Sequence, residues 1–156
     1  MHEPQKIAEN ASETIAARLL AELERAYDDV KSYMAELAPL LELPQPDRAR
    51  LTTVRLKLAQ LRLVQGAGVS QVYRHLIANS DETDRHQLEE MRSDYHRLLQ
   101  AALAHTTKWT LDAVEADWPQ YQNATRMIVD FWLEKMNAER DQLYPLLEKR
   151  PAAERC

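Results

Sequence analysis

The fold of this chain is decided by the stretch from Ile15 to Leu41, which reads IAARLLAELERAYDDVKSYMAELAPLL. Its large apolar residues recur in steps of three or four, so they fall on one face of an α-helix. That face carries Ile15, Leu19, Leu23, Tyr27, Val30, Met34, Leu37 and Leu41. The stretch therefore predicts a long amphipathic helix that buries one side.

The rest of the chain repeats this pattern between proline-rich or polar breaks. The segment 43–47, which reads LPQPD, ends the first helix because proline cannot continue one. Asp117 and Pro119 are typical of a helix start, as N-cap and first-turn residue. Ser12 offers a later start for the first helix, which leaves open a separate N-terminal turn. We expect helices at about 4–42, 47–77, 81–114 and 117–148, followed by a tail at 151–156.

The length and composition of the chain fit one helical domain. It has 156 residues, a usual size for a single domain, and only 2 of them are glycine. Short connections between long amphipathic helices place consecutive helices antiparallel. We therefore expect residues 1–150 to form one all-α domain, an antiparallel up-down-up-down four-helix bundle.

The charge pattern and the single cysteine narrow the classes of protein to be considered. The formal net charge of −5 provides no basic surface for nucleic acid. No apolar run reaches the roughly 18 residues that a membrane-spanning helix needs. Cys156 has no second cysteine to pair with, and the polar N-terminus does not resemble a signal peptide. We expect a cytoplasmic protein that binds neither nucleic acid nor a membrane.

Catalytic signatures are missing from the sequence. It contains no glycine-rich phosphate loop, no H-E-x-x-H, no C-x-x-C and no G-x-S-x-G. Its histidines do not form the Glu-x-x-His pairs that metal sites in helical bundles use. We therefore expect no catalytic residues, no cofactor and no enzymatic activity.

One segment resembles a known family. Residues 131–147, reading FWLEKMNAERDQLYPLL, are similar to the last helix of hemerythrin-like (HHE cation-binding) domains, which reads H-x-x-x-E-E-x-x-L-[YF]-P-x-L. In that alignment Lys135 occupies the histidine position and Glu139 the glutamate position. The segment 94–99, DYHRLL, is similar to the third helix of the family and places His96 at its histidine. The resemblance implies a hemerythrin-like bundle.

The same alignment implies that the di-iron site is lost. The family's other ligand positions fall on Tyr27, Val64 and Gly68, so only His96 and Glu139 remain as vestigial ligands. A second segment, 66–76, reading GAGVSQVYRHL, resembles helix two of Rsd-type anti-sigma regulators. That second resemblance implies a protein-binding role.

The altered ligand positions have two interpretations. Lys135 and Glu139 are four residues apart on the face expected to point inward, where an isolated charge is costly. The first interpretation is a buried polar cluster that Lys135 and Glu139 form with His96 and Tyr27. The second is a slightly rotated last helix, in which Lys135 extends to solvent and Glu139 lies on the surface.

Gly66 and Gly68 stand in the middle of the second expected helix. Each costs about 1 kcal/mol relative to alanine in a helix interior, which indicates a purpose. That purpose is a close helix approach, a pocket, or room for the indole of Trp132 or Trp109. Of these, packing against an indole is the favoured expectation.

These features favour a non-enzymatic regulatory or protein-interaction module on a hemerythrin-like bundle. The alternative is a metal- or oxygen-binding hemerythrin-like protein with an atypical site. The expected partner is another protein or a second copy, with Ile7, Ala11 and Ile15 as an apolar contact stripe. If a pocket exists, a small apolar ligand would make the protein a sensor.

Overall fold

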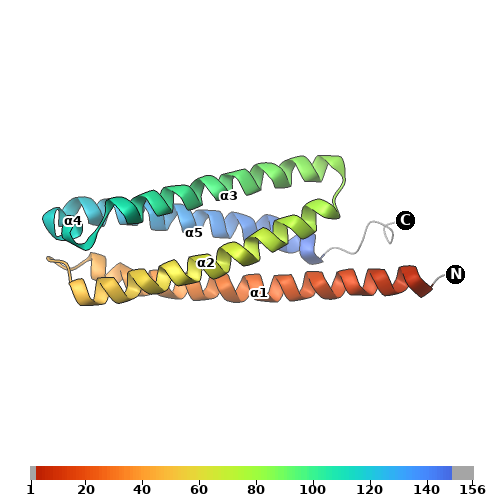
Figure 1. Ribbon diagram of the computed structural model, residues 1–156, viewed down its shortest axis with the longest axis horizontal. Helices are drawn as coiled ribbons and strands as arrows, with labels where there is room; N and C mark the ends of the chain where they lie inside the picture. Colours follow the sequence, from red (N-terminus) through yellow and green to blue (C-terminus); the bar gives the residue numbers. More distant parts are fainter. Residues whose placement is uncertain (1–2, 149–156) are drawn as a thin grey trace.

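The computed structural model describes the backbone of residues 3–148, with the side chains of Lys6 and of residues 14–148. Every regular element in that part of the chain is an α-helix, so the expected all-α class is confirmed. Figure 1 shows the long helices lying side by side along the molecule, with the chain turning back at its ends. The helices are α1 (Glu3–Leu41), α2 (Arg48–Ala78), α3 (Glu82–Lys108), α4 (Leu111–Ala116) and α5 (Trp118–Glu148).

The long helices form a bundle in which α1 and α3 each pack against both α2 and α5. The apolar stripe of α1 supplies much of the core, and its members from Leu19 to Leu41 are buried. Ile15, at the start of that stripe, is 40% exposed, and the side chains of Ile7 and Ala11 lie outside the described ones. The helix runs through Ser12 without a break, so a separate N-terminal turn was wrong.

Short polar side chains cap the ends of the helices. Asp47 begins α2 by accepting a hydrogen bond from the Arg50 N–H, and Asp81 begins α3 by accepting one from Asp84. These starts lie within one residue of the expected ones. The expected tail at 151–156 lies outside the described residues.

The third helix ends six residues before its expected end at 114. Trp109 leaves helical geometry, and its carbonyl accepts a hydrogen bond from the Arg55 guanidinium of α2. Thr110 then caps α4 by accepting from the Ala113 N–H. The continuous helix to 114 was wrong because a tertiary hydrogen bond and a new cap compete with the local helical pattern.

Helix α5 starts as the sequence predicts. Asp117 accepts a hydrogen bond from the Gln120 N–H at 3.3 Å, and Pro119 lies in the first turn. Within the described residues, no helix is both long and apolar enough to cross a membrane.

Candidate functional site

A polar group is buried in the centre of the bundle where α1 meets α5. The Tyr27 hydroxyl donates a hydrogen bond of 2.5 Å to Glu139, whose side chain is only 1% exposed. Lys135 lies 3.9 Å from the other carboxylate oxygen, close enough for ionic attraction but too far for a hydrogen bond. Its ammonium instead donates to the Met91 carbonyl of α3 at 3.1 Å.

Burial determines the protonation states of Glu139 and Tyr27. It raises the pKa of Glu139 to about 7, although the Tyr27 hydrogen bond and the Lys135 charge act in the opposite direction. Burial and the Glu139 charge raise the pKa of Tyr27 far above its usual range. Tyr27 therefore stays a hydrogen-bond donor, while the carboxyl group changes charge near neutral pH.

His96, the fourth residue of the expected polar cluster, does not join the group. Its side chain is exposed, whereas the preceding residue, Tyr95, is 2% exposed and points inward. The same shift occurs on α2, where Val64 is 64% exposed and Gln65 is fully buried. The placement of His96 and Val64 in the core was therefore wrong by one residue.

The inward positions of α2 and α3 repeat every seven residues, a signal that the sequence contained. On α2 the buried series is Leu51, Leu58, Gln65 and Val72, and on α3 it is Leu88, Tyr95 and Ala102, with Trp109 continuing the spacing just after the helix ends. A spacing of seven keeps residues on one side of a packed helix. Following that spacing identifies Gln65 and Tyr95, which the family alignment missed.

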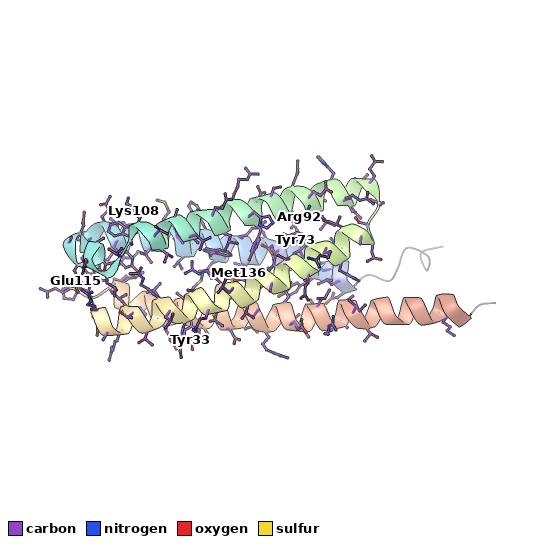
Figure 2. All side chains as sticks on the ribbon, viewed as in Figure 1. Tyr33, Tyr73, Arg92, Lys108, Glu115 and Met136 are labelled. Atoms are coloured by element: carbon purple, nitrogen blue, oxygen red, sulfur yellow. The ribbon has the colours of Figure 1, made fainter. Side chains whose placement is uncertain are left out.

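Several buried polar atoms of α2, α3 and α5 have no hydrogen-bond partner. They are both amide atoms of Gln65, the hydroxyls of Tyr73 and Tyr95, and the indole nitrogen of Trp132. Tyr73 lies inside the bundle, as does Met136 of α5 (Figure 2). Unpaired buried polar groups are rare in proteins and cost free energy, so they call for a specific explanation.

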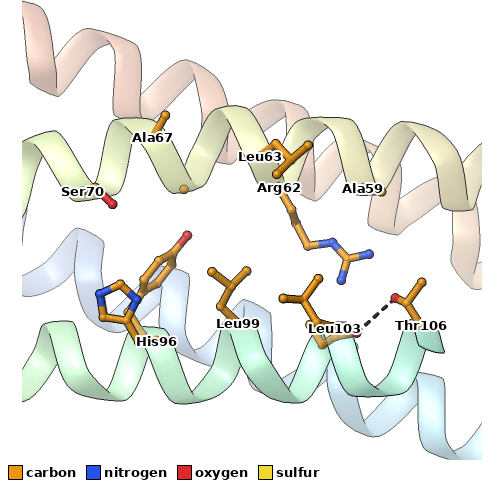
Figure 3. Close-up of a pocket in the computed structure, with 12 residues that line it drawn as sticks. Ala59, Arg62, Leu63, Ala67, Ser70, His96, Leu99, Leu103 and Thr106 are labelled. Carbon is orange, nitrogen blue, oxygen red and sulfur yellow. Dashed lines mark hydrogen bonds between the residues drawn. The ribbon is translucent and has the colours of Figure 1, made fainter. Parts of the chain in front are cut away.

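An apolar groove of about 410 Å³ runs between α2 and α3 (Figure 3). Small or aliphatic residues form most of it, and Leu63 and Leu103 at its edges are more than half exposed. Its lining consists of Ala59, Leu63, Gly66, Ala67, Leu99, Ala102 and Leu103, together with the polar residues Arg62, Ser70, Tyr95, His96 and Thr106.

Gly66 is one reason why the groove is open. A Cβ atom at this position would stand 3.4 Å from the Tyr95 hydroxyl, and no indole lies within 4 Å. A Cβ atom at Gly68 would meet nothing within 4 Å. Packing of these glycines against Trp132 or Trp109 was therefore wrong, and Gly66 instead lines a pocket.

Metal-binding groups do not gather in the described part of the chain. No set of three or more His, Cys, Asp or Glu side chains lies close enough there to hold a metal ion. At the family's ligand level, Glu139 has the cationic Lys135 beside it. An ammonium group repels a metal cation, so the charge of Lys135 beside Glu139 is unfavourable for a metal.

A comparison with protein-family models found no match, and neither did comparisons with curated proteins and with solved structures. The likeness to hemerythrin-like domains therefore rests on the residues quoted above. Of these residues, Lys135 and Glu139 face the interior, whereas His96 and Val64 are exposed.

Proposed function

We propose that this protein is a non-enzymatic regulatory module that binds a small apolar ligand in the groove between α2 and α3. We further propose that its bundle has the antiparallel up-down-up-down arrangement of hemerythrin-like domains without their di-iron site. The observation that carries the proposal is the apolar groove, which is lined in part by Tyr95, whose buried hydroxyl has no hydrogen-bond partner.

The groove has the properties of a small-molecule site. Its volume of about 410 Å³ falls in the range of about 300–1,000 Å³ that is usual for such sites. Such sites combine mostly apolar walls with a few polar groups that orient the ligand. Tyr95 supplies such a group, because its hydroxyl is buried and has no hydrogen-bond partner in the protein.

Features of the groove and of the bundle centre support binding without catalysis. Ser70 and His96 face one another across the groove (Figure 3), but among the described residues no hydrogen bond links them as nucleophile and base. In the centre of the bundle, Tyr27 donates a hydrogen bond to Glu139, and Lys135 lies beside the same carboxyl group. Among the described residues, Glu139 is the one acidic residue buried there.

A ligand in the groove would also change the surface of the protein. Leu63 and Leu103 are 77% and 60% exposed, and they stand at the edges of the groove. A bound apolar molecule would cover part of both side chains. The free and bound forms would then offer different surfaces to a protein partner or a second copy, which is the basis of the regulatory role.

Titration with an environment-sensitive apolar dye tests the proposal. We expect one dye molecule to bind per wild-type chain and to bind Gly68→Leu equally well, because Gly68 does not line the groove. Gly66→Leu, which fills the groove, should abolish binding. Ala59→Trp fills its other end and serves as a second blocking variant, with circular dichroism to verify folding.

Equal dye binding by the blocking variants and the wild type would overturn the groove assignment. Dialysis against iron, zinc and cobalt, followed by metal analysis, tests the alternative. Stoichiometric retention of one or two ions per chain would favour a metal-binding protein and overturn the proposal.

A further inference from the structure

A basic side chain closes one end of the groove. Arg62 leaves α2 and extends across the space toward α3, beside Leu103 and Thr106 (Figure 3). Arg62 and Thr106 also line a second cavity, of about 50 Å³, between α1, α2, α3 and α5. The two cavities therefore adjoin at Arg62.

Three basic side chains line the second cavity, among mostly apolar residues. Arg55 and His105 line it together with Arg62. One guanidinium nitrogen of Arg55 donates to the Trp109 carbonyl, and the other is buried without a partner. Arg62 donates only to the Leu58 carbonyl of its own helix, at 3.3 Å. No carboxylate in the described part of the chain pairs with either guanidinium.

The electrostatics of these groups show that their positive charge is not compensated. Burial and the neighbouring Arg55 charge lower the pKa of Arg62, and the Tyr121 ring hydroxyl only partly opposes them. Burial and the same two guanidinium groups lower the pKa of His105. Guanidinium groups nevertheless remain charged in proteins. An unpaired charge is costly in a half-buried site, and a bound anion would reduce that cost.

We propose that the ligand of the groove is an amphiphilic carboxylate, with its carboxylate on Arg62 and Arg55 and its apolar chain along α2 and α3. This inference rests on the proposed function, because it requires the groove to be a binding site. Two parallel N–H···O bonds from a guanidinium match the geometry of a carboxylate. The groove thus offers a cationic end and an apolar body to the two parts of one molecule.

The dimensions of the two cavities agree with this ligand. The lining of the groove runs along α2 from Ala59 to Ser70, which corresponds to roughly 16 Å of helix. The smaller cavity holds the space of only a few water molecules. It therefore suits a planar carboxylate better than the larger phosphate group.

Three ligands with the same saturated chain test the proposal by calorimetry: decanoate, decanol and decyl phosphate. We expect the wild type to bind decanoate roughly ten- to a hundredfold more tightly than decanol, as hydrogen bonds to a charged group predict. Arg62→Gln should lose this preference. Arg74→Gln removes the same charge from an exposed position of α2 outside the groove, and it should behave like the wild type.

The outcomes separate this inference from the proposed function. Equal binding of decanoate and decanol by the wild type would overturn the carboxylate assignment and leave the apolar site standing. Tighter binding of decyl phosphate would also overturn that assignment. Binding of none of the three, with no displacement of the dye, would count against the groove itself. If Arg62→Gln does not fold, the comparison of acid and alcohol on the wild type still decides.

Discussion

The α1–α5 side and the α2–α3 side of the bundle treat buried polar groups in different ways. On the first, the Tyr27 hydroxyl donates to one oxygen of the buried Glu139 carboxyl across two helices, and the Lys135 ammonium lies 3.9 Å from the other oxygen. On the second, Tyr95 lines the groove, and its buried hydroxyl has no hydrogen-bond partner. The first side thus uses polar residues to join two helices, whereas the second has a buried hydroxyl whose hydrogen-bonding capacity is unused.

Side-chain size explains where the groove between α2 and α3 lies. Helix α1 carries large apolar residues in an unbroken stripe, and those from Leu19 to Leu41 are buried. Helix α2 has Gly66 and Ala67 where the groove lies, so little side-chain volume projects toward α3 there. The comparison teaches that a run of small side chains on one helix is enough to open a groove between two packed helices.

The largest effect on stability should follow from removing the buried carboxyl of Glu139, on the α1–α5 side. Glu139→Ala leaves Tyr27 and Lys135 without their partner, and the loss of one member of a buried pair typically costs about 3–5 kcal/mol. Urea unfolding measures this loss. Glu134→Ala, at an exposed position of α5, should change stability by less than about 0.5 kcal/mol. A similarly small effect at both positions would contradict the structural role of the pair.

The second prediction concerns how the stability of the protein depends on pH. Because folding raises the pKa of Glu139 from 4.5 to about 7, the neutral carboxyl is favoured in the folded state. The stabilisation of the folded state by the neutral Glu139 carboxyl is complete below pH 4.5 and is lost as the pH rises through 7. The loss in unfolding free energy amounts to about 3 kcal/mol. His75 and His105, whose pKa values burial lowers, act in the opposite direction. The measurement is therefore the difference in unfolding free energy between the wild type and Glu139→Gln from pH 4 to 8.

A flat difference across that pH range would show that Glu139 is not buried as described. Titration of the same carboxyl by NMR gives an independent value for its pKa.

Loss of the Tyr27 hydroxyl should have a smaller effect. Tyr27→Phe leaves one oxygen of Glu139 without a donor, at a cost of about 1–3 kcal/mol at pH 8 and less at pH 5, where the carboxyl is neutral. Tyr144→Phe is the matched control, because Tyr144 is half-buried and stacks on Tyr27. Unfolding at both pH values checks the prediction, and an equal loss in the two variants would argue against the hydrogen bond.

The smallest effect on stability should come from replacing the glycines of α2, and these substitutions should stabilise the protein. Gly68→Ala should stabilise the protein by about 0.5–1 kcal/mol, because alanine favours the helix and its Cβ atom meets nothing within 4 Å. Gly66→Ala should gain less, since its Cβ atom would contact the Tyr95 hydroxyl at 3.4 Å. Thermal unfolding compares the two, and a loss of stability at Gly68 would show a contact that the structure lacks.

The inward face of α1 was easier to predict from the sequence than the inward face of α2. On α1, large apolar residues flank Tyr27 at regular spacing, so the inward face was clear, whereas on α5 the sequence left open whether Glu139 faces the core or the surface. On α2, the large apolar residues between Leu61 and Val69 are Leu63 and Val64, which are exposed, and the alignment with a family motif selected Val64 in place of the buried Gln65. A shift of one residue turns a helical position by about 100°, which moves it from the core to the surface.

The sequence by itself determined the all-α class, the limits of most helices and the burial of the α1 stripe, because these follow from local periodicity, prolines and caps. Only the tertiary structure decided that the third helix stops at Lys108, that Gly66 faces Tyr95, and that Arg62 closes the groove. Periodicity shows which face of a helix turns inward. It does not show which neighbour that face meets or whether the space between them is filled, since this depends on side chains distant in the sequence.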